Sequence, residues 1–385
     1  MATLSLLIPS RHEEFLAETV NNLLENIEDD TEILVGLDGA WAEPGLPDHD
    51  RVRILYVPQS IGQRAMQNRL ARMSAAKFVA KVDAHCAFDK GFDRKLIEKM
   101  EDDITMVPKM YNLHAFDWIC KNCGMRFYQG PEPTECRSET CSLDQQGFEK
   151  KIIFKPRQWG PEGRGPTSTA YRFNKNLQFK YFPELKAFQP KEGLAETMSL
   201  QGSFFMCTRE KYWELGLCDE SWGSWGNQGS EVALKTWLSG GRVLCNLDTW
   251  YAHLFRTQKG FSFPYPMSGK SQERARKVSR DIFLNNAWEH QVRPLSWLLE
   301  RFWPALERVG DKEAFWGRRA LRDLKASEAS ITFPRKQGVT GLTSPSSTAG
   351  GSSGELVSSD AVSPTSLDGA VAVPPENIDP VGGQA

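Results

Sequence analysis

Two groups of side chains in this 385-residue chain have the types and spacing of metal ligands. In the first group, Asp83 and His85 are separated only by Ala84 and follow the apolar run 78–82, which is typical of a buried strand. Residues at i and i+2 of an extended backbone point to the same side, so one metal ion could bind both side chains. Exposed turn residues are the alternative, because a D-x-H tripeptide is common by chance.

The second group consists of four closely spaced cysteines, Cys120, Cys123, Cys136 and Cys141. Four thiolates form the closed tetrahedral shell of a structural zinc ion. The glycines and prolines between these cysteines favour loops that could not bury a core alone, and a metal ion stabilises such segments most. The spacing therefore predicts a structural Zn²⁺ site, with free cysteines or a disulfide pair as alternatives.

The elements that position the first group alternate between strands and helices. We expect strands at 4–8, 32–37, 52–57, 78–82 and 104–107, and helices at 15–24, 62–75 and 92–100. This order predicts a mainly parallel sheet with helices on both faces. Ligands of such sheets bind beyond the carboxyl ends of the strands, and Asp38 and Asp83 each follow a strand directly.

This pattern resembles the nucleotide-sugar-dependent glycosyltransferases of the GT-A fold, and specifically their family 2. Residues 4–10 followed by Glu13 are similar to the family's opening strand and its I-P-[ST]-x-N-E signature, with His12 in place of Asn. Residues 32–39 resemble its second strand, Gly62 and Asn68 keep the spacing of its next helix, and the D-x-H tripeptide stands where the family has its metal-binding D-x-D.

Further details resemble the polypeptide N-acetylgalactosaminyltransferases. These enzymes have D-x-H followed by Cys, as at 83–86, a W-G-x-x-x-x-E segment, as at 225–231, and a later H-x-F-R, as at 253–256. The resemblance covers about residues 3–112 and 198–257 and implies sugar transfer from a UDP-sugar donor. It also implies that Mn²⁺ or another divalent cation is held by Asp83, His85 and His253, and that this ion stabilises the charge on the leaving diphosphate.

The same resemblance implies the donor contacts. Asp38 and Glu13 are expected at the base and ribose, and Arg11 and Arg64 at the base edge or diphosphate, with solvated surface positions as the alternative for both arginines. Gly202 is expected to pass close under the donor sugar. The full set of expected donor-binding residues is Pro9, Ser10, Arg11, Glu13, Asp38, Arg64, Asp83, Ala84, Gly202 and Trp225.

The candidate catalytic residues are Asp219, Gln228 and Glu231, within a segment similar to the family's G-x-x-D-E and acidic catalytic motifs. Gly229 stands where inverting members of the family have their catalytic Asp, so the carboxylate base of an inverting transfer is missing. This departure favours a retaining transfer. Glu231 is expected to orient the acceptor or sugar, or to act as a displaced base. The alternative is a structural role as an acid at a helix N-terminus, where the helix dipole stabilises its negative charge.

The expected fold class is α/β: a GT-A, Rossmann-like, mainly parallel sheet with a zinc-binding insertion and a helical C-terminal arm. The expected segments are a nucleotide-sugar-binding half at 1–113, an irregular insertion with the four zinc-binding cysteines at 114–165, an acceptor and catalytic half at 166–260, a helical basic arm at 261–336 and a disordered tail at 337–385.

Composition excludes several classes of protein. The formal net charge of −2 argues against a polybasic nucleic-acid binder as a whole, although residues 254–336 carry more Lys and Arg than Asp and Glu. We expect no membrane span, because no apolar run approaches the ~18 residues that a spanning helix needs. Eight cysteines are too few for a disulfide scaffold, and their clustering indicates a reducing compartment, so we expect a cytoplasmic location.

The sequence therefore predicts a metal-dependent hexosyltransferase that moves a sugar from a UDP-sugar to an unidentified acceptor, which could be a nucleic acid, a glycan or a protein. One alternative is the same chemistry on a modified nucleic-acid base. Another is a catalytically inactive nucleotide-sugar-binding protein, because Gln228 and Gly229 stand in place of acids.

Overall fold

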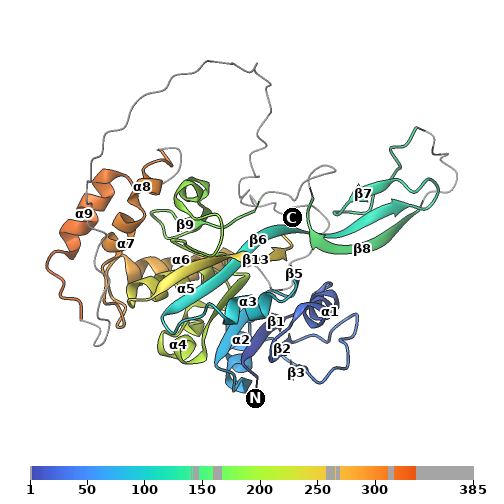
Figure 1. Cartoon of the computed structure of the whole chain (residues 1–385), viewed down its shortest axis with the longest axis horizontal. Coiled ribbons are helices and arrows are strands. Elements are labelled where there is room, and N and C mark those ends of the chain that lie inside the picture. The colour runs from blue at the N-terminus through green and yellow to red at the C-terminus, as the bar shows by residue number, and fades with distance from the viewer. Residues whose placement is uncertain are drawn as a thin grey trace, which may run out of the picture. The chain divides into compact units, whose positions relative to one another are not determined.

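The computed structural model describes residues 2–139, 141, 147–158, 167–256, 265, 269–310 and 316–334 (Figure 1). These residues belong to one compact unit, Met1–Gln337. The tail expected at 337–385 lies outside the described residues.

The centre of this unit is a large mixed sheet. Its main path runs in the order β11 (Leu194–Glu196), β13 (Arg242–His253), β6 (Ile104–Cys120), β12 (Phe204–Thr208), β4 (Phe78–Val82), β1 (Leu4–Ser10), β2 (Thr31–Asp38) and β3 (Val52–Val57). Strand β1 pairs in parallel with β2 and β4, β2 with β3, and β13 with β6, whereas β12 is antiparallel to β4 and β6. The predicted α/β class with a mainly parallel sheet is confirmed.

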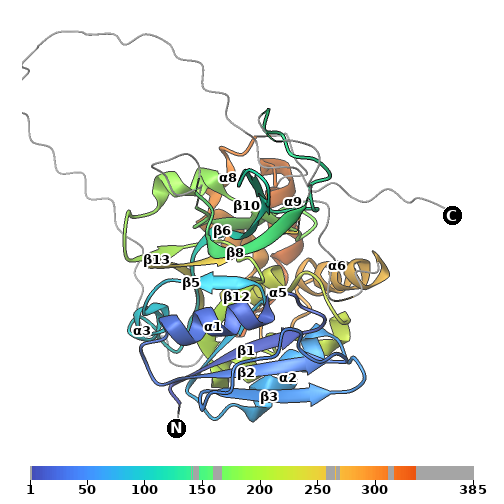
Figure 2. The ribbon, with the colours of Figure 1, turned by 90° about the vertical axis from the view of Figure 1, so that its right-hand side faces the viewer.

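The central strands are covered on both faces. Every residue of β1 and β4 is buried, which explains why their sequences are mostly apolar and do not alternate between apolar and polar residues. Helix α2 (Gln63–Met73) packs on β1 and β2, and α1 (Leu16–Asn26) packs on the short strand β5 (Cys86–Phe88) (Figure 2). Helix α3 (Phe92–Ile97) packs on β13.

A β-hairpin extension replaces the irregular insertion that the sequence predicts at 114–165. Strand β6 continues well beyond the sheet and pairs antiparallel with β7 (Arg126–Tyr128) and β8 (Phe148–Pro156) (Figure 1). The turn-forming residues misled the sequence-based prediction, because the strand residues around them, such as Phe116, Trp118 and Phe148, form the ladder of the hairpin. Part of this segment lies outside the described residues.

The second half of the chain adds helices beside the sheet. They are α4 (Arg209–Glu214), α5 (Gln228–Leu238), α6 (Gly269–Phe283), α7 (Leu295–Arg301), α8 (Trp303–Leu306) and α9 (Arg318–Glu328), with the 3₁₀ turns η1 (Pro183–Phe188) and η2 (Glu220–Trp222). A separate hairpin is formed by β9 (Tyr171–Phe173) and β10 (Phe179–Tyr181). Across the described ranges, the structure contains no helix whose length and apolar character would let it traverse a bilayer.

Candidate functional site

Strand pairing brings the D-x-H tripeptide next to a histidine far along the chain. Asp83 follows the last residue of β4, and its backbone N–H donates to the Ser203 carbonyl, 2.8 Å away. His253 is the last residue of β13, whose antiparallel pairing with β5 sets it opposite Cys86. The Leu254 N–H then donates to the carbonyl of His85. The sheet register thus places both histidines at the carboxyl end of β4.

The ligand atoms of Asp83, His85 and His253 converge. The Nε2 atoms of the two histidines are 3.1 Å apart, and His253 Nε2 lies 3.2 Å from Asp83 Oδ2. Adjacent ligands of an octahedral ion with bonds of about 2.1 Å are separated by roughly 3.0 Å. These separations therefore fit the three residues to one face of a divalent cation such as Mn²⁺ or another borderline metal.

Burial and neighbouring charges keep Asp83 and His253 in the protonation states that a metal needs. Burial lowers the pKa of His253 to about 4, more than the hydrogen bond with Asp83 raises it, so the imidazole is neutral at neutral pH. Burial opposes ionisation of Asp83, but the Lys81 ammonium and the bond from His253 hold the pKa of this carboxyl well below its usual range. A carboxylate and a neutral imidazole both offer lone pairs to a cation.

Glu13 contacts the His85 ring on the nitrogen that faces away from His253. Its Oε2 lies 3.0 Å from His85 Nδ1, and its carboxylate also forms an ion pair with Arg256. A carboxylate on Nδ1 fixes the imidazole so that its Nε2 lone pair faces the metal position. This differs from the expected contact with the base or ribose: Glu13 is 5% exposed, and both of its oxygens already accept bonds from protein groups.

Two residues that contact Asp83 were not singled out from the sequence. Lys81 is a buried lysine of β4 whose ammonium pairs with Asp83 and donates to the Gly202 carbonyl. Gln63, at the start of α2, donates to Asp83 Oδ1 over 3.5 Å. The signal that could have revealed Lys81 is a cation inside an otherwise apolar strand, because a buried lysine requires an acidic or carbonyl partner.

The residues expected to bind the donor near these strand ends differ in how far they are buried. Pro9 and Ser10 end β1 and are buried, as is Ala84 between the metal-binding residues. Arg11 is half-buried, and its Nε has no hydrogen-bond partner among the described residues. Tyr265, which the sequence analysis did not single out, is buried near Asp38: burial raises the pKa of its hydroxyl, and the charge of Asp38 adds to this shift.

Asp38 is fully buried and organises the loop after β3. Its carboxylate accepts hydrogen bonds from Ser60 Oγ at 3.0 Å, from the Ile61 N–H at 2.7 Å and from the Gly62 N–H at 2.9 Å. These bonds fix the start of α2, which carries Gln63 and Arg64. The structure therefore gives Asp38 a positioning role at the donor edge that the sequence did not reveal.

Glu231 and Arg64 form a buried ion pair. Arg64 is 1% exposed and Glu231 is 0% exposed. Glu231 also accepts from Lys235 Nζ at 2.8 Å and from the Asp219 N–H at 3.2 Å, while Arg64 Nη2 donates to the Gly226 carbonyl at 2.7 Å. Arg64 thus contacts protein groups and does not face the expected donor site. The ion pair between Arg64 and Glu231 connects α2 to α5.

The missing acid at position 229 has a steric reason. A Cβ atom on Gly229 would lie 2.2 Å from the Leu200 carbonyl oxygen and 2.9 Å from the Gly202 N–H nitrogen. Real side chains do not reach such distances, so the close approach of α5 to the Gly202 segment requires glycine here. An aspartate at this position would need a different backbone.

The other residues of this segment occupy separate environments. Gln228 is buried and donates to Gln67 Oε1 and Cys218 Sγ. Trp225 is half-buried. Asp219 caps η2 by accepting from the Ser221 N–H, 2.8 Å away.

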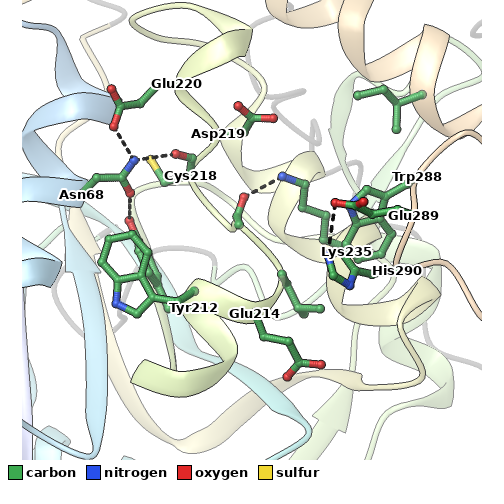
Figure 3. A pocket seen from close by; sticks show the side chains of 14 residues that line it. Asn68, Tyr212, Glu214, Cys218, Asp219, Glu220, Lys235, Trp288, Glu289 and His290 are labelled. Atoms are coloured by element: carbon green, nitrogen blue, oxygen red, sulfur yellow. Dashed lines mark hydrogen bonds and ion pairs between the residues drawn. The ribbon is translucent and has the colours of Figure 1, made fainter.

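Asp219 also lines a cavity of about 420 Å³ that it shares with Glu220, Lys235 and Trp288 (Figure 3). The residues of the Asp83 cluster do not line this cavity. Asp219 therefore lines a cavity to which the three metal-binding residues do not contribute.

The four cysteines expected to bind zinc converge at the far end of the β6–β7–β8 hairpin. All four are free of disulfide bonds, as are the other cysteines of the chain.

Comparison with known proteins matches residues 5–112 to the family Glycosyl transferase family 2. Polypeptide N-acetylgalactosaminyltransferase 3 of Drosophila melanogaster is 22% identical over 66% of this chain and 38% of its own length. Probable N-acetylgalactosaminyltransferase 6 of Caenorhabditis elegans is 29% identical over 31% of this chain and 20% of its own length. The chain thus spans well under half the length of these curated relatives.

Among solved structures, that of GalNAc-T7 with UDP, GalNAc and Mn²⁺ aligns with 85% of this chain and 54% of its own chain, at 16% identity and a TM-score of 0.48. The family match covers the strands and helices that carry Glu13, Asp38 and Asp83. Residues 5–112 of the chain are therefore similar to glycosyltransferase family 2, and the chain resembles the polypeptide N-acetylgalactosaminyltransferases.

Proposed function

We propose that the protein is a metal-dependent hexosyltransferase that moves a sugar from a UDP-sugar to an acceptor. The observation that carries this proposal is the convergence of Asp83, His85 and His253 at the carboxyl ends of the parallel strands. Asp83 and His85 lie within the segment that matches family 2. Open α/β sheets bind their ligands at this edge.

The donor set fits a divalent cation such as Mn²⁺. One carboxylate and two imidazoles, held about 3 Å apart, suit a borderline transition metal better than Mg²⁺, which prefers oxygen ligands. When bound, such an ion supplies positive charge that offsets the negative charge developing on a leaving diphosphate.

The protein's own residues orient this centre and the donor. Glu13 holds His85 in the orientation that leaves its Nε2 free, and Lys81 holds Asp83 through its second oxygen. Arg11, whose Nε is buried without a partner among the described residues, supplies hydrogen-bond donors for the base or diphosphate. Asp38 fixes the loop that begins α2 at the same edge.

Transfer with retention is the stereochemical course that we propose. An inverting transfer requires a carboxylate base on the face opposite the leaving group. Gly229 leaves no room for a side chain, and Glu231 has both oxygens engaged by buried cations and a backbone amide. The absence of a free base at these two described positions supports retention.

The experiment is a UDP-release assay on the purified full chain with Mn²⁺ and a panel of UDP-sugars. Candidate acceptors are supplied as DNA and RNA with hydroxylated bases, glycans and peptides. We expect release with one sugar, its loss upon chelation, and a fall of more than about 100-fold in Asp83→Ala, beyond the effect typical of outer-shell changes. The exposed Asp102→Ala is the matched control. The anomeric configuration of the product then tests retention.

Two outcomes would refute the proposal. Binding of UDP-sugars without release or transfer to any acceptor would favour an inactive binding protein. Release that is unchanged in Asp83→Ala would show that the Asp83 cluster is not the active centre.

We also propose a cytoplasmic location, which is supported by eight cysteines that form no disulfide bond. Fractionation of cells that express the tagged chain tests it.

A further inference from the structure

The end of the β-hairpin extension gathers four thiols that are distant from the Asp83 cluster in the fold. Cys120 is the last residue of β6, Cys123 lies in the turn before β7, and Cys136 and Cys141 follow β7. The four Sγ atoms lie within 4.8 Å of one another. Cys120 and Cys141 are 3.7 Å apart at sulfur, and Cys123 and Cys136 are 3.5 Å apart.

These separations match a tetrahedral metal site and not a disulfide. Zn–S bonds of about 2.3 Å in a regular tetrahedron place the sulfurs about 3.8 Å from each other. A disulfide would bring two sulfurs to about 2.05 Å. The measured distances of 3.5 and 3.7 Å are close to the edge of the tetrahedron and well beyond a covalent S–S bond.

The backbone around the first two cysteines forms a tight turn that presents them together. The Gly124 N–H donates to the Cys120 carbonyl, and the Cys120 N–H donates to the Met125 carbonyl, both at 2.9 Å. Gly124 has a φ of +74°, which glycine adopts without strain. Asn122 Nδ2 donates to Cys141 Sγ at 3.3 Å. Hydrogen-bond donors to sulfur are the outer-shell contacts that stabilise metal-bound thiolates.

The hairpin end is only partly buried among its described residues. Phe127 and Phe148 pack edge to face at 5.4 Å, but Cys123 and Met125 are exposed. A segment with so little buried surface gains most of its stability from a metal ion.

We propose that Cys120, Cys123, Cys136 and Cys141 bind one structural Zn²⁺ ion that fixes the end of the hairpin. Binding forms four Zn–S bonds and releases the protons of those cysteines that are thiols. Because four protein ligands close the shell, the ion has no open position for substrate and takes no part in sugar transfer.

The hairpin is continuous with the strand that borders the Asp83 cluster. Asn112 of β6 pairs with His253, and β6 then runs to Cys120 without a break. Eight residues of strand span roughly 26 Å. The zinc ion therefore stabilises an arm that begins beside the proposed active centre and ends away from it.

The test is the zinc content of the full chain, purified without added metal or chelator, by elemental analysis and native mass spectrometry. We expect one zinc ion that is retained in His253→Ala, which removes a ligand of the other cluster. The same ion should be absent from Cys136→Ser. Cys245→Ala, which changes a buried cysteine of β13, is the matched control and should keep the zinc.

Two further measurements keep the proposal testable if Cys136→Ser fails to fold. Wild-type chain grown with Co²⁺ should show the thiolate-to-metal charge-transfer bands of a tetrahedral site with four thiolate ligands. Removing the metal should speed hydrogen exchange in residues 117–128 while leaving β1 and β4 unchanged.

Three results would overturn the proposal. They are a metal-free chain with eight reactive thiols, a chain with a disulfide among these four cysteines, and a zinc content that Cys136→Ser does not change. Because none of these measurements depends on sugar transfer, failure of the proposed function leaves the zinc site standing, and the reverse also holds.

Discussion

Replacing Glu231 with alanine separates a structural role for this residue from a catalytic one. The substitution removes the shared anionic partner of Arg64 and Lys235, which are 1% and 3% exposed. Removing one partner of a buried ion pair costs about 3–5 kcal/mol, because the remaining charge is left uncompensated. We therefore expect Glu231→Ala to lower the free energy of unfolding by about 3–5 kcal/mol.

The assay is urea and thermal unfolding, followed by tryptophan fluorescence. Trp222 is a suitable reporter, because it is fully buried and packs 5.5 Å from Arg64 and 5.3 Å from Lys235. At roughly 2 °C per kcal/mol for a large domain, the expected fall in Tm is about 6–10 °C. Glu210→Ala, which removes an exposed glutamate of α4, is the matched control and should change stability by less than about 0.5 kcal/mol.

A triple variant tests the cause. Arg64→Met, Glu231→Leu and Lys235→Met together replace all three buried charges with apolar side chains and should recover much of the loss, because buried charged groups can be exchanged for apolar groups at little net cost. If Glu231→Ala keeps wild-type stability but loses UDP release, the ion-pair reasoning is wrong and Glu231 acts in the chemistry.

Other predictions follow from the same site. In the metal-free chain, burial lowers the pKa of His253 from 6.5 to about 4. The unfolded chain therefore takes up a proton that the folded chain does not, and about 3 kcal/mol of stability present above pH 6.5 is lost as the pH falls to 4. His253→Gln should flatten this slope in urea titrations. Asp38→Ala leaves two backbone amides without an acceptor and should cost about 2–4 kcal/mol, measured in the same way. Gly229→Ala forces a Cβ against the Leu200 carbonyl and should lower stability by about 1–3 kcal/mol, whereas Gly317→Ala, with open space around it, should change little in thermal unfolding.

Local patterning was enough to place most elements of the first hundred residues, although it missed the short strand β5. The predicted strands at 52–57 and 78–82 coincide with β3 and β4, and the predicted helix at 62–75 differs from α2 by one residue at its start and two at its end. Buried parallel strands such as β4 are mostly apolar, so their sequence signal is strong. The hairpin at 114–158 was missed because its strands are exposed in part and are separated by turn-forming residues.

Some features of the candidate site could be predicted from the sequence, and others could not. The types and spacing of Asp83, His85 and the four cysteines are local features, so the sequence by itself determined which residues could be ligands. Only the tertiary structure showed which side chains, far apart in the sequence, form hydrogen bonds and ion pairs with each other. Glu13 contacts His85, and Arg64 contacts Glu231, 167 positions further along the chain.

The sequence of this protein determined its parallel α/β core and most of its candidate ligands, because these depend on local patterns, whereas His253 lies 168 positions from His85. The tertiary structure decided which charges became buried partners and why no acid fits at position 229. These outcomes depend on sheet register and on the close approach of α5 to the Gly202 segment, which local patterns do not encode.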